Sequence, residues 1–191
     1  GRRAKASARV AAGDMPHEIA ISPDGKQAAV VAYGSTTIDI FDVATGKLAK
    51  RVDIAPNSRP HGIAWLDDGR IVATTEGSET LTLLSADLAK VEQVSTAQKS
   101  SHMVAISQKG GLAYVANIGS GTVTVIDIET KKKLADIAVG GKPEGIALSP
   151  DGRWLWVGDL AEQAVHIVHT QTRTVIGKVG LHPGAILVPF R

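Results

Sequence analysis

Cysteine is absent from this chain of 191 residues. Its absence excludes disulfide bonds, thiolate metal sites and a cysteine nucleophile. The chain also lacks any apolar run close to the roughly 20 residues that a membrane-spanning helix needs. A hydrophobic signal segment is missing too, and the first residue is Gly1 instead of Met. We therefore expect no membrane span, and a chain that is processed or is part of a longer protein.

An excess of charge of either sign is also missing. Lys and Arg number 21 against 19 Asp and Glu, for a formal net charge of +2. Such a balance gives a weak electrostatic field and does not point to nucleic acid as a partner. A glycine-rich phosphate loop, a serine nucleophile elbow and a metalloprotease helix motif are all absent from the sequence. What remains is a folded chain, with 43% hydrophobic residues, that lacks a complete catalytic motif.

What the sequence does contain is a repeat. One segment recurs four times and begins at Pro16, Pro60, Ser101 and Pro143. From His17 to His61 is 44 positions, to His102 a further 41, and to Glu144 a further 42. This period is within the range of about 40–45 residues that is typical of propeller blades.

Each repeat reads as four short strands. The segment that begins the repeat predicts the first strand, which ends at a glycine-containing turn. A buried run predicts the second strand, at 27–33, 70–75, 112–117 and 154–159. Alternating residues predict the third strand, at 37–41, 80–84, 122–126 and 164–168. A more polar run predicts an exposed fourth strand, at 48–54, 91–96, 134–139 and 175–179.

These strands predict an all-β fold. Four strands per repeat favour a β-propeller over a β-solenoid, whose coils use shorter repeats. We therefore expect a single, partial β-propeller domain over residues 1–191, with repeats at about 15–54, 55–96, 97–139 and 140–180.

A resemblance to a known family rests on two segments of the chain. The run Tyr114-Val115-Ala116-Asn117 and the residues after it, to Asp127, resemble the repeat of the YVTN (YncE-like) family. The segments 143–147 and 149–152 are similar to the first strand of that repeat. The resemblance implies a seven-bladed propeller that is exported, hence periplasmic or secreted.

The two ends of the chain carry parts of further repeats. Residues 1–10 match the outer strand of a repeat, and residues 181–191 match only a first strand. A seven-bladed ring at about 42 residues per blade needs about 294 residues, so four blades and two single strands leave it open. We expect either a fragment or a half-ring that a second copy of the chain completes, because open sheet faces are apolar patches.

Two sets of loops should lie on one face of the propeller, at the mouth of its central channel. Loops that lead into the first strands carry His17, His61, His102 and Glu144 at one equivalent position. Loops that link second to third strands carry Tyr33, Glu76, Asn117 and Asp159 at another. These eight residues are the predicted ligand site. His166 and His169 lie outside it, where surface or turn roles are expected.

The arc of imidazoles has two interpretations. Imidazole nitrogen and carboxylate oxygen are the usual ligands of zinc, iron and manganese, so His17, His61 and His102 are candidate ligands of a divalent metal. A histidine here also suits a general base near neutral pH. The alternative is structural: a polar side chain at this position bonds loop amides that strand pairing leaves free, and adjacent blades keep these residues too far apart to share an ion.

Three functions follow as hypotheses. The first is a non-enzymatic binding or scaffold module whose loop face binds a protein or a small molecule, because no complete catalytic constellation is present. The second is a metal-dependent hydrolase, lactonase or lyase that uses the histidine cluster. The third follows from the family resemblance, which implies a periplasmic accessory to a redox enzyme.

Overall fold

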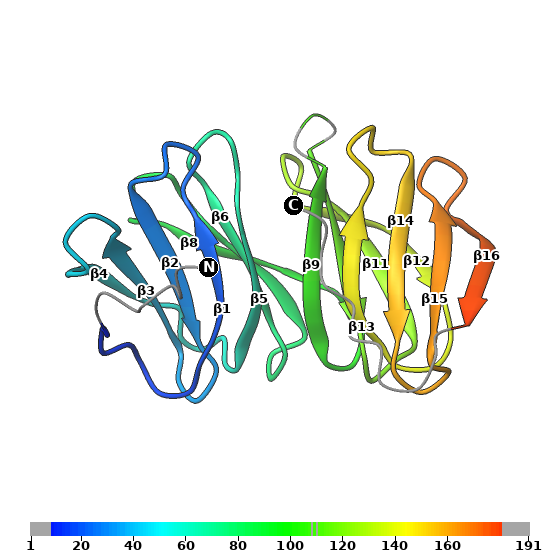
Figure 1. Ribbon diagram of the computed structural model, residues 1–191, viewed down its shortest axis with the longest axis horizontal. Coiled ribbons are helices and arrows are strands. Elements are labelled where there is room, and N and C mark those ends of the chain that lie inside the picture. The colour runs from blue at the N-terminus through cyan, green and yellow to red at the C-terminus, as the bar shows by residue number, and fades with distance from the viewer. Residues whose placement is uncertain (1–8, 108, 110, 181–191) are drawn as a thin grey trace, which may run out of the picture.

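The computed structural model describes residues 9–107, 109 and 111–180. Its sixteen strands form four sheets of four antiparallel strands, each in chain order (Figure 1). Blade 1 holds β1 (Pro16–Ile21), β2 (Gln27–Ala32), β3 (Thr37–Asp42) and β4 (Leu48–Asp53). Blade 2 holds β5 (Pro60–Trp65), β6 (Ile71–Thr75), β7 (Thr80–Leu84) and β8 (Val91–Ser95). Blade 3 holds β9 (Ser101–Ser107), β10 (Leu112–Asn117), β11 (Thr122–Asp127) and β12 (Lys132–Ala138). Blade 4 holds β13 (Pro143–Leu148), β14 (Trp154–Asp159), β15 (Ala164–His169) and β16 (Thr174–Gly180). The prediction of four four-stranded blades is confirmed.

The turn between the first two strands of a blade shows why the repeat folds in this way. In blade 1 the Ser22 hydroxyl donates to Asp24 Oδ1 at 2.7 Å, and the Lys26 amide donates to the same oxygen at 3.1 Å. Gly25 then takes a φ of +72°, a conformation that is open to glycine at little cost. Blade 4 repeats this turn with Ser149, Asp151 and a left-handed glycine.

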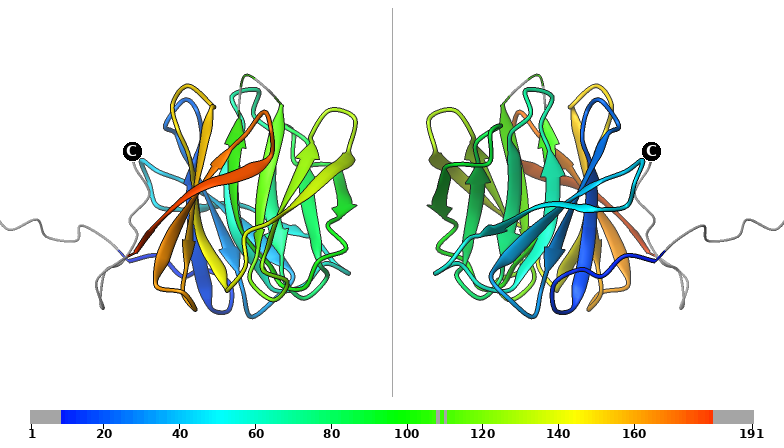
Figure 2. Two further views of the ribbon diagram at one scale, coloured as in Figure 1. Left: turned by 90° about the vertical axis from the view of Figure 1, so that its right-hand side faces the viewer. Right: turned by 90° about the vertical axis from the view of Figure 1, so that its left-hand side faces the viewer.

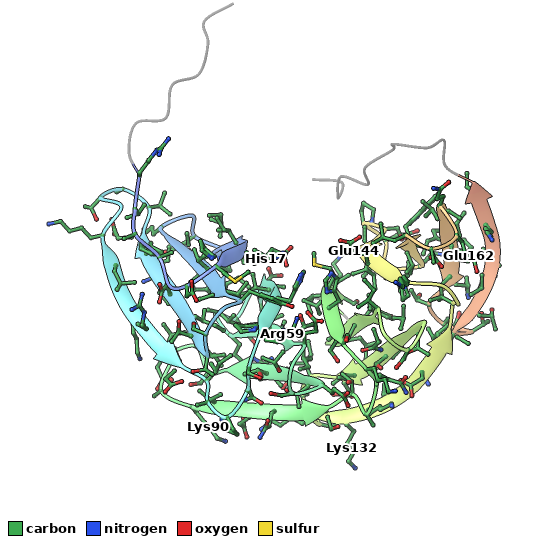
Figure 3. All side chains as sticks on the ribbon, turned by 90° about the horizontal axis from the view of Figure 1, so that it is seen from below. His17, Arg59, Lys90, Lys132, Glu144 and Glu162 are labelled. Carbon is green, nitrogen blue, oxygen red and sulfur yellow. The ribbon has the colours of Figure 1, made fainter. Side chains whose placement is uncertain are left out.

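The blades stand side by side around one axis and form an arc (Figure 3). The first strands β1, β5, β9 and β13 are neighbours on the concave side, and the last strands lie on the convex side. From the side, the outermost strands β4 and β16 cross their blades at a steep angle to the inner strands, which is the twist of a propeller blade (Figure 2). The inner strands therefore bring equivalent residues of successive repeats close together.

Apolar side chains hold adjacent blades together. Ile38 and Ile40 of β3 pack with Ile63 and Ile71 of blade 2 in one buried cluster. A second cluster joins blades 2 and 3, and a third joins blades 3 and 4. These three interfaces fix the positions of the inner strands, on which the candidate site depends.

The first and last blades carry exposed apolar residues. Ile19 and Ile21 of β1 are 60% and 55% exposed, and Trp156 and Ile176 of blade 4 are 40% and 55% exposed. Their covering by a second copy of the chain stays a prediction. The predicted strands at the chain ends lie largely outside the described residues, and Arg9 and Val10, which are described, belong to no strand. No helix long and apolar enough to cross a membrane occurs in the part of the chain that the structure describes.

Candidate functional site

In each blade, the loop before the first strand is hydrogen-bonded to the loop that follows the second strand, on the lower side of the molecule in Figure 1. The carbonyl groups of Met15 and Arg59, each just before an inner strand, accept hydrogen bonds from the amides of Tyr33 and Glu76 at 3.0 Å. Ser100 with Ile118, at 3.1 Å, and Lys142 with Leu160, at 3.0 Å, repeat the contact in blades 3 and 4. The predicted pairing of the two loop sets on one face is therefore present.

A β-bulge at the start of every inner strand aims the site residues. In blade 1, Pro16 pairs with Ala32 but Ile19 pairs with Val30, so one residue is inserted beside His17. Blades 2, 3 and 4 contain the same irregularity beside His61, His102 and Glu144. A bulge redirects a side chain and ends regular pairing, and bulges are common next to functional sites.

Three imidazoles from successive blades stack on one another. The ring centroids of His17 and His61 are 3.8 Å apart, and those of His61 and His102 are 3.6 Å apart. The expectation that adjacent blades keep these residues too far apart to share an ion is wrong for His61 and His102, whose ligand atoms lie within 4.8 Å of each other. Figure 3 shows His17, Arg59 and Glu144 around the concave side of the arc, away from Lys90 and Lys132 on its outer rim.

Two of the three stacked imidazoles, those of His61 and His102, are buried and incompletely hydrogen-bonded. His61 is 6% exposed and His102 is 9% exposed. Within the described residues, neither Nδ1 atom has a hydrogen-bond partner. Burial, together with the neighbouring histidines and Arg59, lowers the pKa of His61 to about 3. His61 is therefore neutral at physiological pH, and each of these rings keeps an unpaired polar nitrogen, at a cost of about 1–3 kcal/mol.

A tyrosine, an arginine and a glutamate flank the stack. The Tyr33 hydroxyl donates to Glu76 Oε2 at 3.0 Å and in turn accepts a hydrogen bond from Arg59. The Arg59 guanidinium lies 4.8 Å from the centre of the Tyr33 ring and 3.7 Å from Glu76 Oε1. Burial and the hydrogen bond to Glu76 raise the pKa of Tyr33. The site thus offers a cation, a neutral hydroxyl and a carboxylate beside the imidazoles.

His102 lies between two carboxylates. Its Nδ1 is 3.9 Å from Glu76 Oε2, and its Nε2 is 3.8 Å from Glu144 Oε1. Burial lowers the pKa of His102, and the two carboxylates oppose that shift. Six predicted residues are therefore brought together by contacts that run through four successive blades: His17, His61, His102, Glu144, Tyr33 and Glu76.

Asn117 and Asp159 are not part of this group, because the predicted equivalence was wrong by one residue. Strand pairing sets Asn117 opposite Ser101 and Asp159 opposite Pro143, as Thr75 is opposite Pro60. The residues equivalent to Tyr33 and Glu76 are Ile118 and Leu160. A shift of one residue along a strand moves a side chain to the opposite face.

Both residues instead hold their own blades together. Asn117 Nδ2 donates to Thr124 Oγ1 at 2.8 Å, and its Oδ1 accepts from Ser101 at 3.1 Å. Asp159 Oδ1 accepts from the amides of Lys142, Ala161 and Glu162 at 2.8–3.0 Å. Asp159 Oδ2 lies 3.2 Å from His166 Nε2.

His166 is 5% exposed, so the expected surface role is wrong for it. His169 contacts Thr172 in a turn, as predicted.

Arg59 and Glu18 contribute to this region and were missed by sequence reasoning. The sequence does contain a signal for Glu18. The residues at its position in the other repeats are Gly62, Met103 and Gly145, none of which is charged, so a charged residue here departs from the repeat. Glu18 Oε2 accepts a hydrogen bond from the Ile63 amide of the next blade at 2.9 Å. Burial raises the pKa of Glu18 from 4.5 to about 7, and the bond from Ile63 opposes the shift.

The raised pKa of Glu18 predicts a pH-dependent stability. Between pH 4.5 and 7 the folded protein holds a proton that the unfolded chain releases, so the free energy of unfolding falls as pH rises through this range. Glu18→Gln removes this proton and keeps an oxygen acceptor for Ile63. We expect the stability of the variant relative to the native protein to rise by about 1–3 kcal/mol from pH 5 to pH 8.

Urea denaturation at the two pH values measures this difference. Glu79→Gln, at an exposed glutamate, is the control and should show no such change. A stability difference for Glu18→Gln that is equal at pH 5 and pH 8 would contradict the burial of this carboxyl group.

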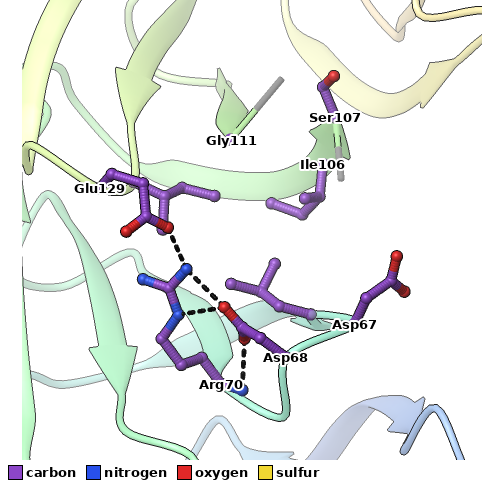
Figure 4. A pocket seen from close by; sticks show the side chains of 9 residues that line it. Asp67, Asp68, Arg70, Ile106, Ser107, Gly111 and Glu129 are labelled. Atoms are coloured by element: carbon purple, nitrogen blue, oxygen red, sulfur yellow. Dashed lines mark hydrogen bonds and ion pairs between the residues drawn. The ribbon is translucent and has the colours of Figure 1, made fainter. Parts of the chain in front are cut away.

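A cavity of about 160 Å³ lies at the opposite end of the interface between blades 2 and 3 (Figure 4). Arg70 lies in its wall and pairs with both Asp68 and Glu129. These charges are compensated within the protein, whereas the imidazole stack has unpaired nitrogens. The candidate site is therefore the channel mouth.

Comparisons with known proteins bear on this fold. The family model described as lactonase, seven-bladed β-propeller, matches residues 5–188. The seven-bladed β-propeller protein Rv1057 of Mycobacterium tuberculosis is 26% identical over 149 residues, which are 75% of this chain and 38% of the relative. A chain of Kuenenia stuttgartiensis hydrazine synthase superposes with a TM-score of 0.82 at 19% identity, over 95% of this chain and 53% of that chain. The chain thus spans less than two-fifths of its curated relative.

The likeness to hydrazine synthase shows the fold alone. The narrower relation to the YVTN (YncE-like) family stays a prediction. The family match covers nearly the whole chain and agrees with the four blades seen in the structure. This chain belongs to the lactonase family of seven-bladed β-propellers.

Proposed function

We propose that the channel mouth binds a small molecule that carries a carbonyl or carboxylate group. The observation that supports this most directly is the pair of buried imidazoles with unpaired Nδ1 atoms. Buried polar groups in native proteins normally have partners, so unpaired ones in a concave region indicate a missing ligand.

The groups around the stack favour an oxygen-rich ligand. Arg59 is the cation of the site, its side chain is 53% exposed, and the Tyr33 hydroxyl lies beside it. A guanidinium binds carboxylate oxygens by charge-assisted hydrogen bonds. A cyclic ester and the hydroxy acid formed by opening it both carry such oxygens, and the family description names lactonases. A small ligand therefore fits better than a protein surface, because the unpaired atoms are buried.

Replacing Arg59 by Met is expected to weaken ligand binding about tenfold or more. A hydrogen bond to a charged group contributes about 1.5–3 kcal/mol, and 1.4 kcal/mol corresponds to a factor of ten. Calorimetric titration with γ-butyrolactone and with γ-hydroxybutyrate measures the change. The matched control is Arg153→Met, which removes a guanidinium that lies 5.7 Å from the Trp154 ring outside the site.

The affinities of the two variants distinguish a specific ligand site from nonspecific binding to the protein surface. Binding that is lost in Arg59→Met and kept in Arg153→Met supports the proposal. Equal affinity of the native protein and Arg59→Met, or no binding of either probe by the folded protein, contradicts it.

A second candidate function is hydrolysis of the bound cyclic ester. The position of His102 between Glu76 and Glu144 favours it, because the flanking carboxylates oppose the lowering of its pKa by burial. Such an imidazole either accepts a proton from attacking water or holds a metal ion that activates the water. Titration of the acid released from γ-butyrolactone, with His102→Asn as the inactive comparison, separates hydrolysis from binding alone.

A further inference from the structure

Two groups of side chains in the described residues bring three metal-ligating atoms within 4.8 Å of one another. One consists of His61, Glu76 and His102 at the channel mouth. The other consists of Asp159, Glu162 and His166 inside blade 4. The chemistry of their remaining contacts distinguishes them.

The group in blade 4 is already neutralised by the protein. Asp159 accepts three backbone amides and contacts His166 Nε2. Glu162 forms an ion pair with Lys178. An ion there would have to displace these partners, so this group is a structural network.

The group at the channel mouth differs in its two imidazoles, which have unpaired nitrogens, although its carboxylate, Glu76, contacts Tyr33 and Arg59. His61 and His102 are both more than nine-tenths buried, and each has an Nδ1 atom without a hydrogen-bond partner. In the tautomer that places the proton on Nε2, an imidazole offers the Nδ1 lone pair, which is what a transition-metal ion binds. We infer that His61, Glu76 and His102 form a site for a divalent transition-metal ion of the zinc type, in which Glu76 takes the place that the sequence suggested for His17.

The donor set and its spacing fit such an ion. Two imidazoles and one carboxylate, with a fourth position left for water or a ligand, are a known ligand set of zinc sites. Ligands at about 2.1 Å in a tetrahedral arrangement are about 3.4 Å from one another, so three atoms that lie within 4.8 Å of one another must approach by at most about 1.4 Å. His17 stacks on His61 but is exposed and is not part of the group.

Neighbouring side chains are placed to orient the ligands. Metal-bound histidines usually direct their second nitrogen at a carboxylate, and metal-bound carboxylates are themselves hydrogen-bonded. Glu144 lies 3.8 Å from Nε2 of His102, which leaves Nδ1 for the ion. Tyr33 donates to Glu76 at 3.0 Å. This inference goes beyond the proposed binding of an organic ligand and does not depend on it.

Titration of the metal-free protein with Zn²⁺, and with Co²⁺ followed by visible absorption, tests the inference. The protein is produced without an affinity tag so that added histidines contribute nothing. We expect one equivalent to bind, with the absorption of a four- or five-coordinate Co²⁺ ion. His61→Ala, His102→Ala and Glu76→Gln should each weaken binding about 100-fold or more, since loss of an outer partner alone costs 10–100-fold.

His169→Ala removes an imidazole from a turn outside the site and is the matched control. Circular dichroism establishes that each variant is folded, and Glu76→Gln, which keeps the shape of the side chain, guards against a failure of the alanine variants to fold. Loss of binding in the site variants with native affinity in His169→Ala supports the inference. No stoichiometric binding by the folded native protein, or an equal loss in His169→Ala, overturns it.

Discussion

Replacing Gly62 by alanine is expected to destabilise the protein by about 1–3 kcal/mol, because the new methyl group would overlap the neighbouring blade. A Cβ at this position would lie 2.9 Å from the carbonyl oxygen of His102 and 2.9 Å from Cα of Met103. Both atoms belong to the backbone of β9 and cannot rotate away. The inner strands β5 and β9 would have to separate, which would also pull His61 away from His102.

Urea denaturation of Gly62→Ala measures the effect. The control is Gly177→Ala in the outer strand β16, where the nearest atom to a new Cβ is 3.8 Å away and no strain arises. We expect the control to change stability by less than about 0.5 kcal/mol. A Gly62→Ala protein as stable as the control would contradict the close approach of blades 2 and 3 at the site.

Replacing Asp159 by alanine is expected to cost about 3 kcal/mol or more. The carboxylate accepts three backbone amides of the loops around β14 and contacts a buried histidine. Hydrogen bonds to a charged group contribute about 1.5–3 kcal/mol each, and their loss leaves His166 without this partner. Burial raises the pKa of Asp159, but the amides of Lys142, Glu162 and Ala161 and the His166 ring outweigh it and lower the pKa overall.

The comparison is Asp151→Ala, which removes an exposed aspartate that also accepts a backbone amide, from Arg153. We expect this exposed turn to lose less than about 1 kcal/mol. Metal affinity at the channel mouth should be unchanged in folded Asp159→Ala, since the residue serves its own blade. A loss of stability no greater than that of Asp151→Ala would show that the network carries little of the stability of blade 4.

Much of the fold could be predicted from the sequence because its signals are local. Alternation in 37–41, 80–84, 122–126 and 164–168 depends on two faces of one strand, and the structure has strands in all four places. Glycines such as Gly25 and Gly152 mark turns because glycine takes a positive φ at little cost. The period of the repeat then indicated the blades of a propeller.

The composition of the site could be predicted only in part. The recurrence of His17, His61 and His102 pointed to the channel mouth, and the structure stacks these rings. The second loop set was misaligned in blades 3 and 4, because the predicted second strands 112–117 and 154–159 end one residue before the position that Tyr33 holds at the end of 27–33. Counting from the strand ends therefore selected Asn117 and Asp159 where Ile118 and Leu160 stand.

Crystallographic anomalous scattering at the zinc absorption edge, from crystals of the native protein soaked in Zn²⁺, tests the central assignment most directly. The assignment predicts one strong peak about 2.0–2.2 Å from a nitrogen of His61, a nitrogen of His102 and an oxygen of Glu76. A map without a peak among these three side chains, or with zinc only at exposed histidines such as His17, would contradict it.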